Sequence, residues 1–274
     1  MFNSTPCTPK TSASAPAVAL RDVRKVYGRG EGAVVALDGI SVGLAGGSFT
    51  AVMGPSGSGK STFLNVAAGL DRPSAGIVTL GDTDLARLSE RRLTVLRRQR
   101  IGFVFQAFNL LPSLTVAQNI ALPLRLDGHR LRRSAVRDVA ARVGLEKRLR
   151  HRPSELSGGQ QQRVAIARAL VTRPDVVFAD EPTGALDTRT GHEVLALLRE
   201  VVDEEGRTVV MVTHDPAAAA WADRVILLAD GRVAGTLDAP SAEQDVVVDA
   251  DRLLSGHDCR GGGVALHGRV RAQD

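Results

Sequence analysis

Cysteine is nearly absent from this chain of 274 residues, and the two that occur, Cys7 and Cys259, lie near opposite ends. Their separation, together with the lack of a cluster of cysteine and histidine, argues against a disulfide framework or a structural metal site. Long apolar runs are missing too, because no stretch approaches the ~20 residues that span a bilayer. The N-terminal segment lacks the basic start and apolar stretch of a signal peptide. We therefore expect a cytoplasmic protein.

Lysine is also scarce: the chain has 31 Arg but only four Lys, with a formal net charge of +5. A basic balance alone does not separate nucleic acid, an anionic membrane surface and phosphate ligands as partners. One of the four lysines, however, lies in a segment that fits the phosphate-binding loop G-x-x-x-x-G-K-[ST]. Its residues are Gly54, Pro55, Ser56, Gly57, Ser58, Gly59, Lys60 and Ser61.

This phosphate loop (residues 54–61) has the context that the motif requires, between an apolar strand at 49–53 and a helix expected from about 59 to 68. Glycines let backbone N–H groups close around the β- and γ-phosphates, and the helix points its positive end at them. We expect Lys60 to neutralise phosphate charge, Ser61 to coordinate Mg²⁺, and Thr62 to join the nucleotide contacts. The plainer alternative is a glycine-rich turn before an ordinary helix, which the complete strand, loop and helix disfavour.

Two adjacent carboxylates end a short apolar strand at 176–179. A carboxylate in the position of Asp180 is costly to desolvate unless a metal pairs with it, so we expect it to hold Mg²⁺ through water. Glu181 points to a different side and is placed to polarise the attacking water as general base. The alternative is a solvated strand end that turns into a loop. That alternative is weak in the company of Lys60.

A second glycine loop, Leu156-Ser157-Gly158-Gly159-Gln160, looks like a phosphate cradle without a nucleotide of its own, so we interpret it as serving a neighbouring subunit. With the helix that follows and the motifs above, it resembles the signature loop of the nucleotide-binding subunits of ATP-binding cassette (ABC) transporters. The resemblance covers about residues 18–240. It implies an α/β fold, namely a P-loop NTPase core of ABC type with an antiparallel β subdomain and an inserted α-helical signature subdomain at about 107–171.

The resemblance also implies an ATPase that uses ATP and Mg²⁺ and works as a head-to-tail homodimer. Each ATP would lie between the phosphate loop of one copy and the signature loop (residues 156–160) of the other. Ser157, Gly158 and Gly159 would offer hydroxyl and backbone donors to the γ-phosphate.

Four further positions match the family. The resemblance places Tyr27 against adenine, Gln106 at Mg²⁺ and the water, Asp187 at the dimer interface, and His214 at the γ-phosphate. Without the resemblance, we would interpret Tyr27 as a core or edge-strand residue and His214 as a structural histidine. The expected catalytic residues are Glu181, His214 and Gln106, and the expected Mg²⁺ ligands are Ser61, Gln106 and Asp180. The other nucleotide-binding positions are Tyr27, residues 54–62, Ser157, Gly158, Gly159, Gln160 and Asp187.

Several segments resemble one branch of the family, the MacB/LolD type, namely residues 102–106, 108–112, 122–124 and 183–187. Ala185 departs from the pattern, because many members have Asn there. The branch pairs with a separate, FtsX-like four-helix permease, which implies a peripheral protein at the cytoplasmic face of the membrane that drives export or lipoprotein or peptide release. The alternative is an FtsE-like ATPase that regulates a cell-wall hydrolase without transport.

Soluble ABC proteins of DNA repair or translation need two cassettes or a long coiled-coil insertion. This chain shows neither, so we expect no nucleic-acid partner. We expect the cassette at residues 17–240, between a disordered N-terminal tail at 1–16 and a loosely ordered C-terminal tail at 241–274. A last expectation concerns the permease: a groove for its cytoplasmic helix, lined by Phe105, Phe108, Leu110 and Leu111.

Overall fold

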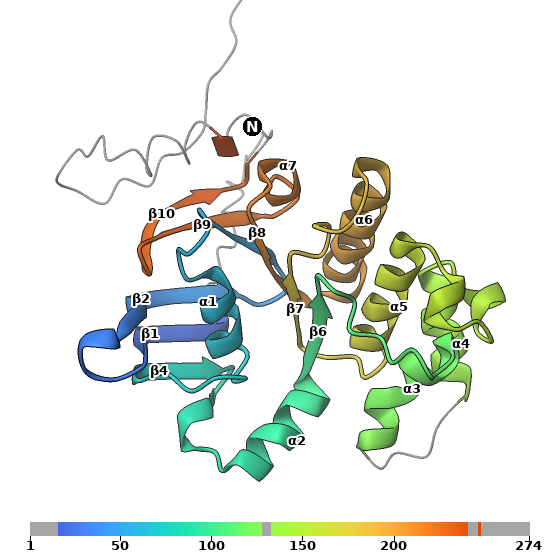
Figure 1. Ribbon diagram of the computed structural model, residues 1–274, viewed down its shortest axis with the longest axis horizontal. Coiled ribbons are helices and arrows are strands. Elements are labelled where there is room, and N and C mark those ends of the chain that lie inside the picture. The colour runs from blue at the N-terminus through green and yellow to red at the C-terminus, as the bar shows by residue number, and fades with distance from the viewer. Residues whose placement is uncertain (1–15, 128–132, 241–245, 248–274) are drawn as a thin grey trace, which may run out of the picture.

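The computed structural model describes residues 16–127, 133–240 and 246–247 (Figure 1). The tails expected at 1–16 and 241–274 lie outside the described residues, apart from Pro16, Val246 and Val247. Pro16 begins the first strand, and Val246 is buried against the core.

The elements alternate along the chain between strands and helices. The strands are β1 (Pro16–Tyr27), β2 (Val34–Ala45), β3 (Phe49–Met53), β4 (Ala75–Leu80), β5 (Thr83–Asp84), β6 (Ile101–Phe105), β7 (Val176–Asp180), β8 (Thr208–Thr213), β9 (Arg224–Ala229) and β10 (Arg232–Asp238). The α-helices are α1 (Lys60–Ala67), α2 (Glu90–Arg100), α3 (Val116–Leu126), α4 (Arg133–Arg142), α5 (Gly158–Leu170), α6 (Thr188–Glu205) and α7 (Pro216–Ala219).

A six-stranded sheet of order β10-β9-β3-β8-β7-β6 forms the centre, and all its neighbours are parallel except the edge pair β9–β10. Both faces of this sheet are covered, which is why its strands are continuous apolar runs; every residue of β8 is buried. Alternate side chains of the strands enter two separate cores. One core packs against α3 to α6, and the other against α1 and a second sheet.

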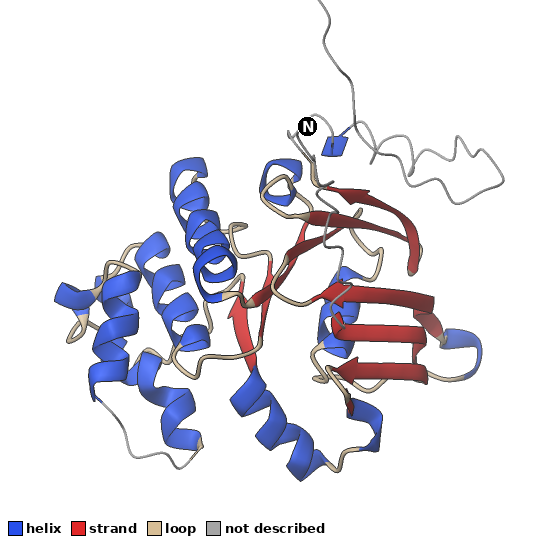
Figure 2. Ribbon diagram, turned by 180° about the vertical axis from the view of Figure 1, so that it is seen from behind, coloured by secondary structure: helices blue, strands red, loops and turns tan. Residues whose placement is uncertain are grey.

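The second sheet is antiparallel, with order β2-β1-β4-β5. Figure 2 shows it at one end of the molecule and the helical block of α3 to α5 at the other. The helical block is inserted between β6 and β7, which pair directly, so the chain leaves the central sheet and returns beside its point of departure. On α4, Val136 and Ala140 form the buried face, which Val143 continues just after the helix. The predicted ABC-type α/β architecture, with its β subdomain and helical insertion, is confirmed.

Helix α2 and strand β10 were not predicted from the sequence, because the apolar pattern of each is weak. In α2 only Leu93 is fully buried, and five of its eleven residues are arginines, so no apolar stripe recurs at helical spacing. In β10 no residue is fully buried, because the strand lies at the edge of the sheet. Exposed and half-buried residues alternate along β10, but only Val233 and Leu237 place apolar side chains against the cores.

Candidate functional site

Several loops meet at one edge of the central sheet. Strands β3, β8, β7 and β6 are parallel, so their carboxyl ends lie side by side, with Met53 opposite Thr213 and Phe105 opposite Asp180. In open parallel sheets this edge is where ligands bind. The predicted site residues that end or follow these strands are Gly54, Gln106, Asp180, Glu181 and His214.

The phosphate loop is a tight turn that requires glycine at two positions. Gly59 has a φ of 97° and precedes α1, and a Cβ there would lie 2.4 Å from the carbonyl oxygen of Ala36. A Cβ on Gly54 would lie 2.1 Å from the carbonyl oxygen of Leu228. Both distances are far below van der Waals contact, so a side chain at either position would push the loop out of place.

Lys60 lies inside this loop. Its side chain is nearly buried, and Nζ donates hydrogen bonds to the carbonyl oxygens of Gly54 (2.8 Å) and Pro55 (2.7 Å). Burial lowers the pKa of Lys60, while the charges of Glu181 and Asp180 raise it. A fixed ammonium beside a turn of backbone N–H groups is suited to bind an oxyanion such as phosphate.

Asp180 and Glu181 end β7 in different surroundings. Burial raises the pKa of Asp180, the charge of Glu181 raises it further, and Lys60 opposes both. Glu181 has a φ of 44°, in the left-handed region that few residues other than glycine adopt. Its N–H donates to the carbonyl oxygen of Val212 (2.9 Å), and its Oε1 lies 2.8 Å from Nδ1 of His214. The fold therefore joins two predicted catalytic residues directly.

Gln106 approaches the same carboxylate beside Gly184. A Cβ built on Gly184 would lie 2.8 Å from Nε2 of Gln106 and 3.2 Å from Oε2 of Glu181. Because only glycine leaves room there, the amide of Gln106 and the carboxylate of Glu181 face one small space.

Tyr27, at the end of β1, is 41% exposed and lies beside the phosphate-loop helix. Its hydroxyl donates to Oδ2 of Asp71 (2.8 Å), and Nζ of Lys25 lies 4.8 Å from its ring centroid. Burial and the Asp71 hydrogen bond raise the pKa of Tyr27, and the hydroxyl of Thr62 opposes them. The phenol is therefore anchored at its hydroxyl end, while part of its ring remains open to solvent.

The signature loop forms the start of α5. Ser157 is the N-cap: its Oγ accepts the N–H of Gln160 (3.3 Å), and Oε1 of Gln160 accepts the N–H of Ser157 (3.2 Å). A Cβ on Gly159 would lie 2.2 Å from Cγ2 of Thr190, so α6 packs directly on this loop. Asp187 caps α6 by accepting the N–H of Thr190 (3.0 Å), which lowers the pKa of its carboxyl. The signature helix α5 and the phosphate-loop helix α1 pack on opposite faces of the central sheet.

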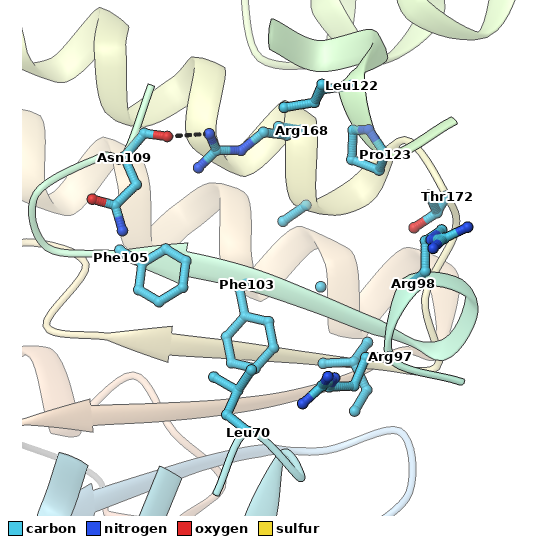
Figure 3. Close-up of a pocket in the computed structure, with 13 residues that line it drawn as sticks. Leu70, Arg97, Arg98, Phe103, Phe105, Asn109, Leu122, Pro123, Arg168 and Thr172 are labelled. Carbon is cyan, nitrogen blue, oxygen red and sulfur yellow. Dashed lines mark hydrogen bonds between the residues drawn. The ribbon is translucent and has the colours of Figure 1, made fainter. Parts of the chain in front are cut away.

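A cavity of about 410 Å³ opens between α2, β6, α3 and α5 (Figure 3). Its apolar lining includes Leu70, Phe103, Phe105 and Leu122, and its arginines are Arg97, Arg98 and Arg168.

The expected groove residues are only partly in this cavity. Of the four named from the sequence, Phe105 alone lines it. Phe108 instead approaches the signature loop, because a Cβ on Gly158 would lie 3.9 Å from its Cζ. Leu110 packs against the core of the helical block, and Leu111 is 44% exposed. These three residues therefore lie outside this cavity, because the chain turns sharply after Gln106, and their contact with a permease helix stays a prediction.

Comparison with known proteins decides the family. A family model described as "ABC transporter" matches residues 37–184, which is more than half of the chain. The chain belongs to the ABC transporter family. It is an ATPase cassette of that family.

Individual relatives support the same family assignment. An uncharacterized ABC transporter ATP-binding protein of Methanocaldococcus jannaschii is 45% identical over 222 residues, covering 79% of this chain and 94% of that protein. A macrolide export ATP-binding/permease protein of Paracoccus denitrificans is 49% identical over 233 residues, covering 84% of this chain. The cassette spans only 35% of the length of that second protein.

A solved structure matches the cassette as well. The dimeric structure of the M. jannaschii protein in a post-hydrolysis state, bound to ADP and Pi, has a TM-score of 0.76 and 42% identity. The match covers 82% of this chain and all of that one. The resemblance found in the sequence, to ABC subunits of the MacB/LolD type, is confirmed by these relatives. Among the described residues of the cassette, no helix has the length and apolar character needed to cross a bilayer.

Two buried amides of the cassette were not predicted from its sequence. Gln162, on α5, is fully buried and donates through Nε2 to the carbonyl oxygen of Pro182 (2.7 Å), which ties the signature helix to the segment after Glu181. Asn119, on α3, accepts the N–H of Leu111 (2.9 Å) and donates to its carbonyl oxygen (3.1 Å). The sequence holds a signal for Asn119 only, because the pattern Thr-x-x-Gln at 115–118 marks a helix start just before it.

Proposed function

We propose that this ATPase works as a homodimer around two ATP molecules and drives a membrane permease for export. The observation that carries the proposal is the convergence of Lys60, Asp180, Glu181 and His214 at one sheet edge. Support for the dimer comes from the M. jannaschii relative, which was solved as a dimer bound to ADP and Pi. The relative named for macrolide export favours transport over FtsE-like control of a cell-wall hydrolase.

In this proposal the site residues act on different parts of the reaction, namely the phosphates, the attacking water and the adenine. Lys60 binds phosphate oxygens with the ammonium now held by two loop carbonyls. Glu181 takes the proton of the attacking water as general base, and His214 orients its carboxylate through Nδ1. Tyr27 stacks on the adenine with the ring that Asp71 holds at its hydroxyl.

The site also fits Mg²⁺, which prefers oxygen ligands. The hydroxyl of Ser61, the carboxylate of Asp180 and the amide oxygen of Gln106 are all oxygen donors from segments at this edge. The raised pKa of Asp180 indicates a carboxylate whose charge a nearby cation would stabilise. In addition, the buried Oγ of Ser58 has no hydrogen-bond partner among the described residues, as expected of a group that serves the nucleotide–metal complex. When bound, Mg²⁺ would neutralise phosphate charge.

The signature loop completes the site of the other copy. Helices α5 and α1 pack on opposite faces of the sheet, and in the proposed head-to-tail dimer the signature loop of one copy meets the ATP held by the phosphate loop of the other. The capping box uses Oγ of Ser157 as an acceptor, which leaves its hydrogen free to donate to an incoming phosphate.

Ser157→Arg should abolish hydrolysis without weakening ATP binding to an isolated chain, since the changed loop acts on ATP held by its partner. Mixed with Lys60→Ala, it forms heterodimers in which one site carries both changes and the other is intact, so part of the activity should return. Hydrolysis and calorimetric ATP binding are measured on both variants and on the mixture. Ser134→Arg, the same change at an exposed position of α4, is the control. A parallel loss of ATP binding in Ser157→Arg would place the loop at its own nucleotide.

The cavity beside Gln106 is the proposed docking site of the permease, at the cytoplasmic face of the membrane. Its apolar lining suits the apolar face of a short helix. Its arginines are fixed by protein carbonyls: Arg97 donates to Gly69 (2.7 Å), and Arg98 to Leu126. Of the two, Arg98 pairs with Asp127 at 3.5 Å, whereas Arg97 forms no ion pair with a described residue. The occupant should therefore bring a carboxylate next to its apolar residues.

Arg97→Glu should weaken co-purification of the coexpressed permease by about tenfold or more, because like charges facing each other cost several kcal/mol. The cassette's own ATPase activity should stay unchanged. Arg91→Glu is the matched control, since Arg91 is an exposed arginine of the same helix that does not line the cavity. The proposal fails if Arg91→Glu weakens the complex as much as Arg97→Glu does.

A further inference from the structure

The turn that follows Gln106 contains two successive residues in the left-handed region. Phe108 has a φ of 58° and Asn109 a φ of 49°. This conformation is unfavourable for residues with a Cβ, and phenylalanine tolerates it less well than asparagine. Both N–H groups bond backwards, to the carbonyl oxygens of Phe105 (3.1 Å) and Ala107 (2.6 Å). The carbonyl groups of Phe108 and Asn109 are left to find partners elsewhere.

Both carbonyls are bound by one side chain of the signature helix. Arg168, in the last turn of α5, donates through Nη2 to the carbonyl oxygen of Phe108 (2.8 Å). Its Nη1 donates to the carbonyl oxygen of Asn109, as Figure 3 shows. The planar fork of a guanidinium supplies two such donors in a fixed geometry, which a lysine does not. Two adjacent backbone carbonyls are thereby held in the geometry that the left-handed pair creates.

Arg168 forms no ion pair with a described residue. Burial lowers the pKa of its guanidinium, and no carboxylate of a described residue contributes to that shift. A partly buried cation without an anionic partner among the described residues is costly, so its hydrogen bonds to the two carbonyl groups matter for keeping it there. The ring of Phe108 adds a second contact with α5, near Gly158 at the opposite end of the helix.

We infer that Arg168 is a positioning residue that fixes the turn at residues 105–109 (the Gln106 turn) to the signature helix. Gln106 and the signature loop would then move as one unit. The consequence for catalysis rests on the proposed role of Gln106, whereas the attachment itself does not. Because Arg168 also lines the cavity, an occupant of the cavity would meet this attachment directly.

Arg168→Gln in the full chain should lower kcat for ATP hydrolysis by roughly tenfold, because a misplacement of about 1 Å near the chemistry can cost up to 10²-fold. The KM for ATP should change little, since the phosphate loop and Tyr27 are untouched. Amide hydrogen exchange at residues 105–112 should become faster. Arg163→Gln is the matched control, because Arg163 lies on the same helix but binds Glu193 and the carbonyl oxygen of Val143 instead.

A second substitution separates positioning from a merely structural role. Adding Asn109→Gly to Arg168→Gln removes one unfavourable left-handed residue, so the turn needs the arginine less and kcat should recover by about threefold. Loss of packing or charge at Arg168 would not be repaired by a glycine in the turn. If Arg168→Gln yields no folded protein, Arg168→Lys takes its place, with a smaller loss and the same recovery expected.

The inference is overturned if exchange at residues 105–112 is unchanged in Arg168→Gln, if Arg163→Gln has an equal effect, or if Asn109→Gly restores nothing. Gln106→Ala distinguishes failure of the proposed function. A wild-type kcat in Gln106→Ala would show that Gln106 has no catalytic role. Faster amide exchange in Arg168→Gln would still establish that Arg168 attaches the Gln106 turn to the signature helix.

Discussion

Glu181→Gln is expected to lower kcat for ATP hydrolysis by about 10² to 10⁴-fold, the usual contribution of a general base. The carboxylate faces the amide of Gln106 on one side and Nδ1 of His214 on the other, and a glutamine keeps the shape but not the basicity. Binding of ATP should persist, because Lys60 and the phosphate loop are unchanged. The variant should therefore accumulate as an ATP-bound dimer.

The two parts of this prediction are measured separately. Steady-state hydrolysis gives kcat, and gel filtration with and without ATP gives the oligomeric state. Glu204→Gln makes the same chemical change at an exposed position of α6 and should leave both unchanged. A variant that keeps most of its activity would exclude Glu181 as the base, and one that stays monomeric with ATP would count against the two-site dimer.

Lys60→Ala is expected to weaken ATP binding by about 10²-fold or more, and hydrolysis with it. Removing one partner of a buried, hydrogen-bonded charge pair costs about 2–5 kcal/mol, and Lys60 is the ammonium enclosed by the loop. The fold should survive, because burial already lowers the pKa of this side chain and its loss removes a desolvated charge.

Calorimetry of ATP binding and a thermal melt decide the outcome for Lys60. Lys147→Ala is the control, since Lys147 is an exposed lysine of the helical block and should have no effect. Unchanged ATP affinity in Lys60→Ala would refute the assignment of the phosphate loop, whatever the melt shows.

The parts of the site that could be predicted are those set by short stretches of sequence. The phosphate loop is one of them, because the positions of Gly54 and Gly59 follow from steric contacts that exclude any side chain. The strand before Asp180 is another, because burial on both faces requires an unbroken apolar run. The position of the signature loop also followed from local sequence, through its resemblance to the family. The catalytic roles of these residues stay predictions.

Other features could not be predicted, because they depend on contacts and backbone conformations that no short stretch of sequence specifies. Helix α2 has almost no apolar stripe, because one face borders the arginine-lined cavity and only Leu93 is fully buried. The direction of Phe108 depends on two positive φ values that its residue type would not suggest. The partner of Arg168 lies some sixty positions earlier in the chain.

The sequence by itself determined the family, the phosphate and signature loops, and the apolar strands that lead to Asp180 and His214. These depend on glycine positions and on burial patterns, which act over a few residues. Only the tertiary structure decided that Glu181 meets His214, that Phe108 turns toward Gly158 rather than the cavity, and that Arg168 binds the Gln106 turn. Those contacts join segments far apart in the chain, and they are set by the parallel order of the strands and by a few left-handed residues.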